Sequence, residues 1–303
     1  MLLILTSKKQ IGSKMKTFLL LLKNHLDKKS LDFSVSNFEE IEVFIQKGDV
    51  RMNIAGVPLQ KWTTVYPRKV GKYRGLAHML AHLSIKNNIF FIDRFHTHTK
   101  DSSDVAKILQ MFHLALNHVS IPKTYVSATY TKKQIKNAVA YLGLPLVVKE
   151  TNTSQGSGVF LAKTIESLQQ ILQERSLTKV GREIFLQEFI PNTFEYRILV
   201  MGDKSAVAEK KIRSQDEEFR NNVHLGAKEE FISLQQVPST VKDTAELAAR
   251  VTNIQIAGID VIENSSGIPI VFEVNSCPAF TLDEIISPEI RSLSNYLILC
   301  EKK

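Results

Sequence analysis

Cysteine is scarce in this chain, which has only Cys277 and Cys300 among its 303 residues. The pair has neither the spacing of metal ligands nor the number needed for a disulfide framework, so a reducing compartment is expected. Long apolar runs are also missing, and Phe18–Leu22 is far too short to span a bilayer. Met1–Thr6 lacks the basic stretch and long apolar core of a signal peptide. These absences predict a cytoplasmic protein with no membrane partner.

Several signatures of known chemistry are absent too. There is no GxGxxG in the first 95 residues, no GxxxxGK[ST] loop, and no legible Ser/His/Asp or Cys/His arrangement. The net charge is +8, but the lysines are spread out and no basic block or aromatic-interleaved motif appears. A lysine-rich solvated surface explains most of this charge. Nucleic-acid binding is therefore disfavoured, and phosphate or carboxylate ligands remain as the alternative.

The hydrophobic content of 44% and charged content of 23% are ordinary for a globular protein of about two domains. Strands and helices alternate through the first 95 residues, which predicts a small open α/β layer. No internal repeat or low-complexity segment interrupts the chain. The strands expected further on include Leu146–Lys149, Val159–Ala162, Phe185–Ile190, Glu195–Met201, Lys204–Lys211, Ile254–Ile262 and Ile268–Val274.

The most informative stretch is AGIDVIENSSGIPIVFEVNSCPAF, from Ala257 to Phe280, which reads as two strands joined by a turn. Glu273 and Asn275 are two apart and share a face, and a hairpin can bring Asp260 opposite them. Such oxygen ligands on apolar strands are costly to bury unless a cation lies between them, and they suit Mg²⁺. The alternative is a solvated sheet face whose acids gather by chance.

A second signal is the glycine-rich hairpin that follows Lys149. Gly156, Ser157 and Gly158 would let backbone N–H groups approach phosphate oxygens, while Lys149 would supply a fixed positive charge. The segment Thr151–Gly158 is then a natural lid over a nucleotide. A plain hairpin tip on the surface is an equally good interpretation of this segment taken alone.

Two further signals are polar groups around strands. Leu186–Ile190 could present backbone groups to a purine, and Glu195 could accept hydrogen bonds from ribose hydroxyls. A cross-strand ion pair of Glu195 and Arg197 explains the same pattern equally well. Arg220 is by type a bidentate binder of carboxylate or phosphate, whereas a lone His224 is more often structural than a general base.

Taken in order, these motifs resemble the ATP-grasp superfamily, and among its members the RimK-type glutamate ligases. Lys107, fifteen residues before Pro122, resembles the family's earlier lysine, and VYPRKVG at Val65–Gly71 resembles its N-terminal PR-x-G segment. Each motif is modest, but the ordered set is specific and covers most of residues 63–280. The other matching stretches are VVKETNTSQGSGVFL, LQEFIPNTFEYRILVMGD, EFRNNVHLGA, AGIDVIE and FEVNSCPAF.

The resemblance implies an α/β (α+β) architecture, the ATP-grasp fold, in which two mixed subdomains clamp ATP after an N-terminal open α/β domain. We expect these three units at 1–95, 96–185 and 186–303. The resemblance implies Mg²⁺, with Mn²⁺ as an alternative, at Asp260, Glu273 and Asn275. It implies that Arg220 and Asn222 face the γ-phosphate and an acyl phosphate, with Arg197 near them. The residues implied at ATP are Lys107, Lys149, Gly156, Ser157, Gly158, Gln187, Glu188, Phe189, Ile190, Glu195 and Lys211.

The match has departures, mostly on the acceptor side: Cys277 and Ala279 replace the usual Ser and Gly, and Glu195 stands where Asp is usual. The implied activity is ATP-dependent ligation through an acyl phosphate, with glutamate or another amino acid joined to a small molecule or peptide. The implied partners are ATP, a carboxylate-bearing amino acid or peptide and an amine acceptor, and homo-oligomerisation stays open. The alternatives are an ATP-binding partner module with weak or no ligase activity and a basic nucleic-acid-binding protein.

Overall fold

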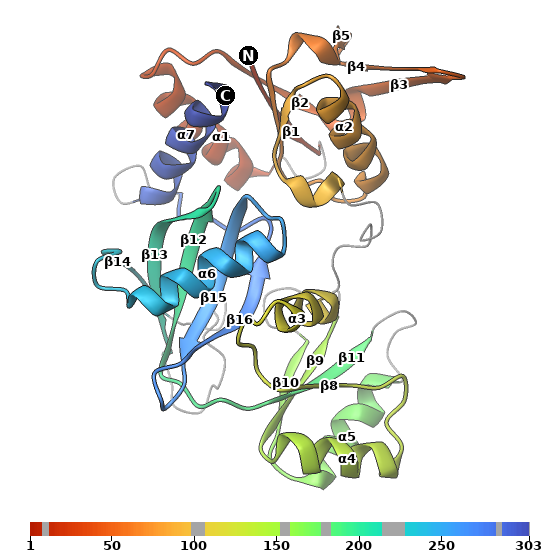
Figure 1. Cartoon of the computed structure of the whole chain (residues 1–303), viewed down its shortest axis with the longest axis vertical. Coiled ribbons are helices and arrows are strands. Elements are labelled where there is room, and N and C mark those ends of the chain that lie inside the picture. Colours follow the sequence, from red (N-terminus) through yellow and green to blue (C-terminus); the bar gives the residue numbers. More distant parts are fainter. Residues whose placement is uncertain are drawn as a thin grey trace.

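The computed structural model describes residues 1–7, 12–97, 107–151, 158–176, 183–213, 228–282 and 287–302. Figure 1 shows an elongated molecule with the N-terminal layer at one end, a large sheet in the middle and a small sheet with two helices at the other end. Sequence-distant segments meet in the first layer, where the N-terminal helix and the C-terminal helix lie side by side. Within the described ranges, no helix is long and apolar enough to cross a membrane.

The N-terminal layer is a parallel sheet in the order β2-β1-β6-β7, with a three-stranded hairpin sheet, β3-β4-β5, projecting from it. The apolar run at Leu2–Thr6 forms the fully buried central strand, as expected for a parallel sheet covered on both faces. The elements of this layer are β1 Leu2–Thr6, α1 Ser13–Asp27, β2 Phe33–Asn37, η2 Phe38–Glu40, β3 Ile41–Gln46, β4 Asp49–Ile54, β5 Val57–Pro58, η3 Leu59–Lys61, β6 Thr64–Pro67, α2 Arg74–Lys86, β7 Phe90–Phe91 and η4 Arg94–Thr97.

The small sheet at the far end has the order β10-β9-β11-β8 and is covered by α4 and α5. Helix α4 begins at a capping box, because Thr131 and Gln134 bond each other's backbone N–H, and it ends at Gly143 with φ of 78°. The elements here are β8 Thr124–Val126, α4 Lys132–Leu142, β9 Leu146–Glu150, β10 Val159–Ala162, α5 Ile165–Ser176 and β11 Ile184–Glu188.

The large middle sheet is antiparallel, with the order β14-β13-β12-β15-β16. Alternate residues of its strands face opposite ways: Tyr196 and Ile198 pack in the core under α6, whereas Leu199 and Met201 pack in the core shared with α1 and α7. Its elements, with the helix α3 that packs beside it, are α3 Lys107–Leu116, β12 Phe194–Met201, β13 Lys204–Ile212, β14 Lys228–Ile232, α6 Ser239–Val251, β15 Ile256–Glu263, β16 Pro269–Asn275 and α7 Pro288–Glu301.

Most expected elements are present, with shifted ends. The strand expected at Phe185–Ile190 ends at Glu188, so Phe189 and Ile190 lie beyond it, and the expected unit boundary between 185 and 186 falls inside β11. Residues 49–61 form β4, the second strand of the projecting hairpin, followed by β5 and the short helix η3. Strand β14 was not expected, because its acid-rich sequence KEEFI lies exposed at a sheet edge and carries no alternating pattern.

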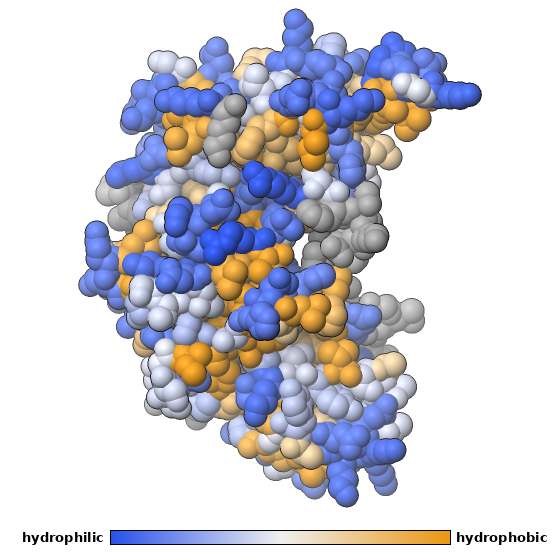
Figure 2. All heavy atoms as spheres, in the orientation of Figure 1, coloured by the Kyte–Doolittle hydropathy of each residue, from blue (hydrophilic) through white to orange (hydrophobic). Residues whose placement is uncertain are grey.

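The face in Figure 2 is mainly hydrophilic over the N-terminal layer and over the small sheet's helices, whereas hydrophobic residues gather in the middle. Helices α3 and α6 occupy this middle region in the same view. On α3, Phe112 is 55% exposed and Leu116 is 61% exposed. The polar site described next lies on the opposite face of the middle sheet from α6.

Candidate active site

A row of charged side chains crosses the middle sheet on the face away from α6. Arg197 on β12 is the register partner of Glu209 on β13 and of Asp260 on β15, and Asp260 is in turn the partner of Glu273 on β16. Register partners share a face, so strand pairing alone places these four side chains in one line of mostly alternating charge. The predicted pairing of Asp260 with Glu273 across a hairpin is confirmed.

Asp260 is the centre of this row and is 5% exposed. Its Oδ1 accepts a hydrogen bond from Arg197 Nε at 2.8 Å and its Oδ2 accepts one from Arg197 Nη2 at 2.9 Å, a bidentate pair. Asn275 Nδ2 donates to Oδ2 at 3.4 Å. Burial alone would raise the pKa of Asp260, but the Arg197 and Lys211 charges hold that pKa well below its usual range. Asp260 is therefore a permanent anion at neutral pH.

Lys211 joins the row to Glu195. Its Nζ donates to Asp260 Oδ1 at 3.0 Å and to Glu195 Oε1 at 2.9 Å, although the lysine is only 4% exposed. Burial raises the pKa of Glu195, and the adjacent Lys211 charge opposes that rise. The ion pair considered for Glu195 and Arg197 exists in another form, because Glu195 pairs with Lys211 and Arg197 with Asp260.

Two lysines from outside the sheet converge on its last strand. Lys107, at the start of α3, contacts Glu273 Oε1 at 2.9 Å. Lys149, on β9 of the small sheet, lies with its Nζ 5.4 Å from the centre of the Phe272 ring on β16. Burial lowers the pKa of Lys149 to about 8, with the Glu273 charge opposing and the Lys107 charge adding to the decrease. The site thus draws cations from two sheets and a connecting helix.

The residues expected near adenine lie around the end of β11. Gln187 is 1% exposed and its Nε2 donates to Thr124 Oγ1 at 2.9 Å, so its side chain points into the protein. The Glu188 carboxylate accepts from the backbone N–H of Lys123 at 2.8 Å. Phe189 and Ile190 follow the strand and are partly exposed. The backbone groups around Glu188 to Ile190 are therefore better placed for recognition than the Gln187 side chain.

Several expected site residues lie outside the described residues: Gly156, Ser157, Arg220, Asn222 and His224. Of the glycine-rich hairpin, Gly158 is described, and its backbone carbonyl accepts from the N–H of Glu150 at 2.8 Å. This bond extends the β9–β10 pairing by one step beyond Val159 and anchors one end of the hairpin.

Sequence reasoning missed a buried pair of acids at the other end of the row. Glu209 and Glu289 are 5% and 1% exposed, and their carboxyl groups hydrogen-bond each other. Burial, together with the neighbouring Glu289, raises the pKa of Glu209 to about 8. Glu289 also accepts from Ser287 Oγ at 2.8 Å. Two carboxyl groups in contact share a proton. In the sequence, only the alternating direction of side chains along β13 indicates that Glu209 faces the site.

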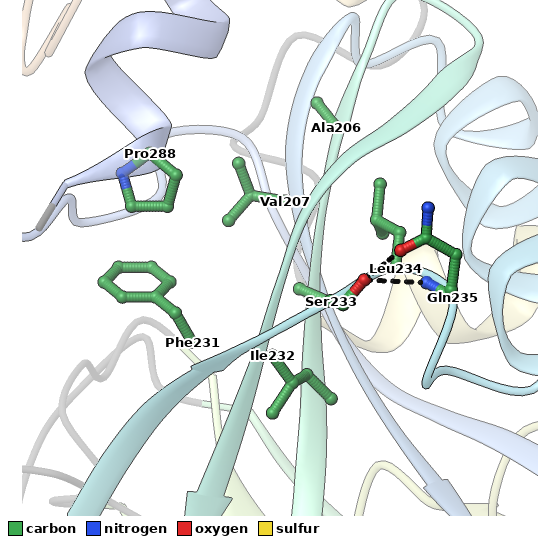
Figure 3. Close-up of a pocket in the computed structure, with 9 residues that line it drawn as sticks. Ala206, Val207, Phe231, Ile232, Ser233, Leu234, Gln235 and Pro288 are labelled. Carbon is green, nitrogen blue, oxygen red and sulfur yellow. Dashed lines mark hydrogen bonds between the residues drawn. The ribbon is translucent and has the colours of Figure 1, made fainter.

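The middle sheet also has an apolar hollow of about 300 Å³ between β13, β14 and the start of α7. Figure 3 shows Phe231 and Pro288 facing Val207 across it, with the hydrogen-bonded Ser233 and Gln235 at one end. The charged row does not line this hollow, which lies at the β14 edge of the sheet. It adds no polar group to the candidate site.

The donor set of the row fits a hard divalent cation. Asp260, Glu273 and Asn275 offer carboxylate and amide oxygens on one face, which are the ligands that Mg²⁺ takes together with water and phosphate. Lys107 now occupies one oxygen of Glu273, and Arg197 and Lys211 bond to Asp260. The described ranges hold no cluster of three or more His, Cys, Asp or Glu side chains arranged as metal ligands.

Comparison with solved structures places this fold among ATP-grasp ligases. The ATP-grasp ligase PsnB complexed with minimal precursor, Mg and ADP superposes with a TM-score of 0.73 at 14% identity, covering 100% of this chain and 98% of that one. The macrocyclase MdnC bound with precursor peptide MdnA from Microcystis aeruginosa MRC gives 0.63 at 16% identity, covering 99% of both chains. At these identities the similarity is one of fold.

The family follows from the sequence comparison. The family model described as the RimK-like ATP-grasp domain matches residues 102–288, more than half of the chain. The chain belongs to this family. A probable alpha-L-glutamate ligase of Cellvibrio japonicus (strain Ueda107) is 33% identical over 180 residues, covering 58% of this chain and 56% of that protein. A second from Rhodopirellula baltica is 32% identical over 181 residues, covering 59% and 42%. The matched region thus spans about half the length of these relatives.

Proposed function

We propose that this protein is an ATP-dependent carboxylate–amine ligase, which forms an amide or peptide bond through an acyl phosphate and releases ADP. The observation that carries the proposal is the convergence of Asp260, Glu273 and Asn275 with four basic side chains on one sheet face. Those cations are Lys107, Lys149, Arg197 and Lys211. An acidic set framed by cations suits the phosphates of ATP and their metal, and membership of the RimK-like ATP-grasp family supports the same chemistry.

The reaction needs two transfers. A substrate carboxylate oxygen attacks the γ-phosphorus of ATP, the bond to the β-phosphate oxygen breaks, and ADP leaves. An amine then attacks the acyl carbon, phosphate leaves, and the nitrogen loses one proton. Both steps gather negative charge, so the residues would act by positioning and neutralising it. Bound at Asp260, Glu273 and Asn275, Mg²⁺ (or Mn²⁺) would supply further charge neutralisation at the phosphates.

Most of the expected site residues have a proposed part in this scheme. Lys107 and Lys149 would bind ATP phosphates, and Glu195 with Lys211 would border the ribose. Arg197, fixed by its two bonds to Asp260, would face the acyl phosphate. Glu188, Phe189 and Ile190 would flank adenine, and Gly158 would end the loop over the phosphates. Arg220 and Asn222 would complete the catalytic set, with Gly156 and Ser157 in the covering loop.

The substrate class follows from the relatives. The curated relatives are named probable alpha-L-glutamate ligases, and solved neighbours include ATP-grasp ligases with precursor peptides. We propose an amino acid, with glutamate first, as one substrate and a peptide or small molecule as the other. Neither Cys277 nor Cys300 forms a disulfide in the described part of the chain, which suits a reducing cytoplasm. The rival functions are an ATP-binding module without turnover and a nucleic-acid-binding protein. Nucleic-acid binding would have no need for the acidic residues of the row.

ADP release in the presence of Mg²⁺ and mixed amino acids and peptides tests the proposal, with mass spectrometry of the products to identify the new bond. Glu273→Gln keeps the side chain's shape but removes its charge, and we expect at least about a hundredfold loss of turnover. Glu263→Gln is the matched control, because this glutamate ends β15 away from the row and should retain activity.

Near-normal ADP release by Glu273→Gln would refute the site. Nucleotide binding without any acceptor-dependent ADP release, across amino acids, peptides and cell extract, would favour the module without turnover. A filter-binding salt titration with nucleic acid checks the third function, which predicts a steep loss of affinity with salt.

A further inference from the structure

An enclosed arginine lies directly after β6, in the N-terminal layer. Arg68 is only 5% exposed, and its guanidinium lies over two adjoining aromatic rings, 4.6 Å from the Phe18 centroid and 4.5 Å from the Phe280 centroid, with the two centroids 5.9 Å apart. Its Nη1 donates to Tyr66 Oη at 3.0 Å. Burying a guanidinium costs free energy unless aromatic contacts and hydrogen bonds compensate for the lost water, and the contacts of Arg68 provide this compensation.

The second hydrogen bond of Arg68 reaches the loop that follows β16, the strand that carries Glu273 and Asn275. Its Nη2 donates to the backbone carbonyl of Pro278 at 2.8 Å, across 210 positions in the sequence. Pro278 comes three residues after Asn275, and Phe280, which stacks on the guanidinium, belongs to the same loop. A single side chain of the N-terminal layer therefore holds residues 276–280 by a hydrogen bond and a stacking contact.

The same loop is also held from the sheet. Pro278 packs against Gly258, where an added Cβ would lie 2.9 Å from the Pro278 Cβ, closer than atoms tolerate. Gly258 is the register partner of Asn275, so the loop folds back over the strand pair that carries the candidate metal ligands. Only glycine at position 258 leaves room for Pro278, and the backbone carbonyl of Pro278 accepts the hydrogen bond from Arg68.

We propose that Arg68 is a positioning residue for the metal site: it fixes the 276–280 loop, and through it Asn275, in the place that Mg²⁺·ATP binding needs. This inference rests on the proposed function. The planar guanidinium contacts both rings and donates in two fixed directions, to Tyr66 and to Pro278, and the compact ammonium of lysine cannot do all of this. The N-terminal layer thereby takes part in nucleotide binding without touching the nucleotide.

Hydrogen exchange and calorimetry test the inference without turnover. Arg68→Lys and Arg68→Met should accelerate exchange of the amides in residues 276–282. They should also raise the Mg²⁺ concentration needed for half-maximal binding of a non-hydrolysable ATP analogue by roughly 10–100-fold, the usual effect of losing a group that orients a metal ligand. Arg94→Lys and Arg94→Met are matched controls in the same layer, with an exposed side chain, and should change neither quantity.

Gly258→Ala gives an independent variant, because it displaces Pro278 while Arg68 stays in place. It should reproduce both effects, and it keeps the test decisive if Arg68→Met does not fold. Unchanged exchange in Arg68→Lys and Gly258→Ala would overturn the contact. Faster exchange with an unchanged Mg²⁺ requirement would overturn the positioning role while leaving the proposed function intact. Absence of turnover in the unaltered protein would instead count against the proposed function, and if the analogue does not bind either, the positioning role falls with it.

Discussion

At the scale of single residues, three cations of the site are held by carboxylates of the protein itself. Asp260 pairs with Arg197 and Lys211, and Glu273 pairs with Lys107, so these three positive charges each have an internal partner. Among the residues that the structure describes, Lys149 forms no hydrogen bond or ion pair, and burial lowers its pKa to about 8. We infer that Lys149 gains most from an added anion, because a phosphate would restore the favourable environment of its charged form.

Lys149→Met should weaken binding of an ATP analogue by about 10–100-fold, the effect of losing one charged hydrogen bond. In the unaltered protein, affinity should be steady below pH 8 and fall above it, because phosphate binds the protonated amine and the pKa of Lys149 is about 8. Calorimetry between pH 6.5 and 9.5 checks both points. The exposed Lys163, replaced in the same way, is the control. Identical pH profiles in Lys149→Met and the unaltered protein would contradict the assignment.

Arg220 lies outside the described residues, and its role stays a prediction from its residue type and family position. Arg220→Lys keeps the charge but loses the fork that binds a carboxylate by two parallel bonds. We expect a loss of about 2–3 kcal/mol in kcat/KM for the carboxylate substrate at saturating ATP. Arg250→Lys, on the exposed end of α6, should be silent. A change below about threefold in Arg220→Lys would leave a solvated loop as the explanation.

At the scale of elements, hairpins and caps could be predicted from sequence, whereas strand neighbours could not. Asp260 and Glu273 could be paired because a short turn joins their strands, and Thr131 could be placed at a helix start by its own side chain. No local pattern indicates that β12 lies beside β15, so Arg197 could not be matched to Asp260. The contact between Lys107 and Glu273 likewise depends on packing between distant segments.

The buried acid pair makes the packing of α7 on β13 dependent on pH, because Glu289 is on α7 and Glu209 is on β13. Glu209 holds a proton in the fold up to about pH 8, far above the usual range of a carboxyl, so the contribution of this group to folding stability falls as pH rises from about 5 to 8. Glu209→Gln carries no such proton. The free energy of unfolding of this variant, relative to that of the unaltered protein, should therefore rise across this interval by up to about 1.4 kcal/mol per pH unit. Its melting temperature should rise relative to the unaltered protein in the same way.

Calorimetric melting at several pH values measures this difference. Glu230→Gln, on the exposed strand β14, is the matched control and should show a constant offset. A melting-temperature difference between Glu209→Gln and the unaltered protein that does not vary with pH would contradict the shared proton.

At the scale of the whole molecule, the cores divide the chain unevenly. One core joins the N-terminal layer to the middle sheet through α1, α7 and strands β1, β12, β13 and β15, whereas the small sheet has a core of its own with α4 and α5. Leu293→Ala and Leu168→Ala remove the same side chain from fully buried positions in the two cores, at a cost of about 2–5 kcal/mol each.

Hydrogen exchange should separate their effects. Leu293→Ala should accelerate exchange in both the N-terminal layer and the middle sheet, and Leu168→Ala only in residues 124–188, since local opening follows shared cores. Uniform acceleration throughout the chain by either variant would show that the protein opens as one unit.

The packing of α1 against α7 also has a consequence for synthesis on the ribosome. The two helices are separated by more than 250 residues, so α1 leaves the ribosome roughly 10–60 s before its partner helix at translation rates of about 5–20 residues per second. During that interval the apolar face of α1 that contains Phe18 and Leu22 lacks its cover, whereas the small sheet can close over local contacts. Nascent chains stalled after residue 282 should therefore be cleaved by protease within α1 but resist cleavage in the small sheet, and equal resistance of both would show that α1 finds another cover.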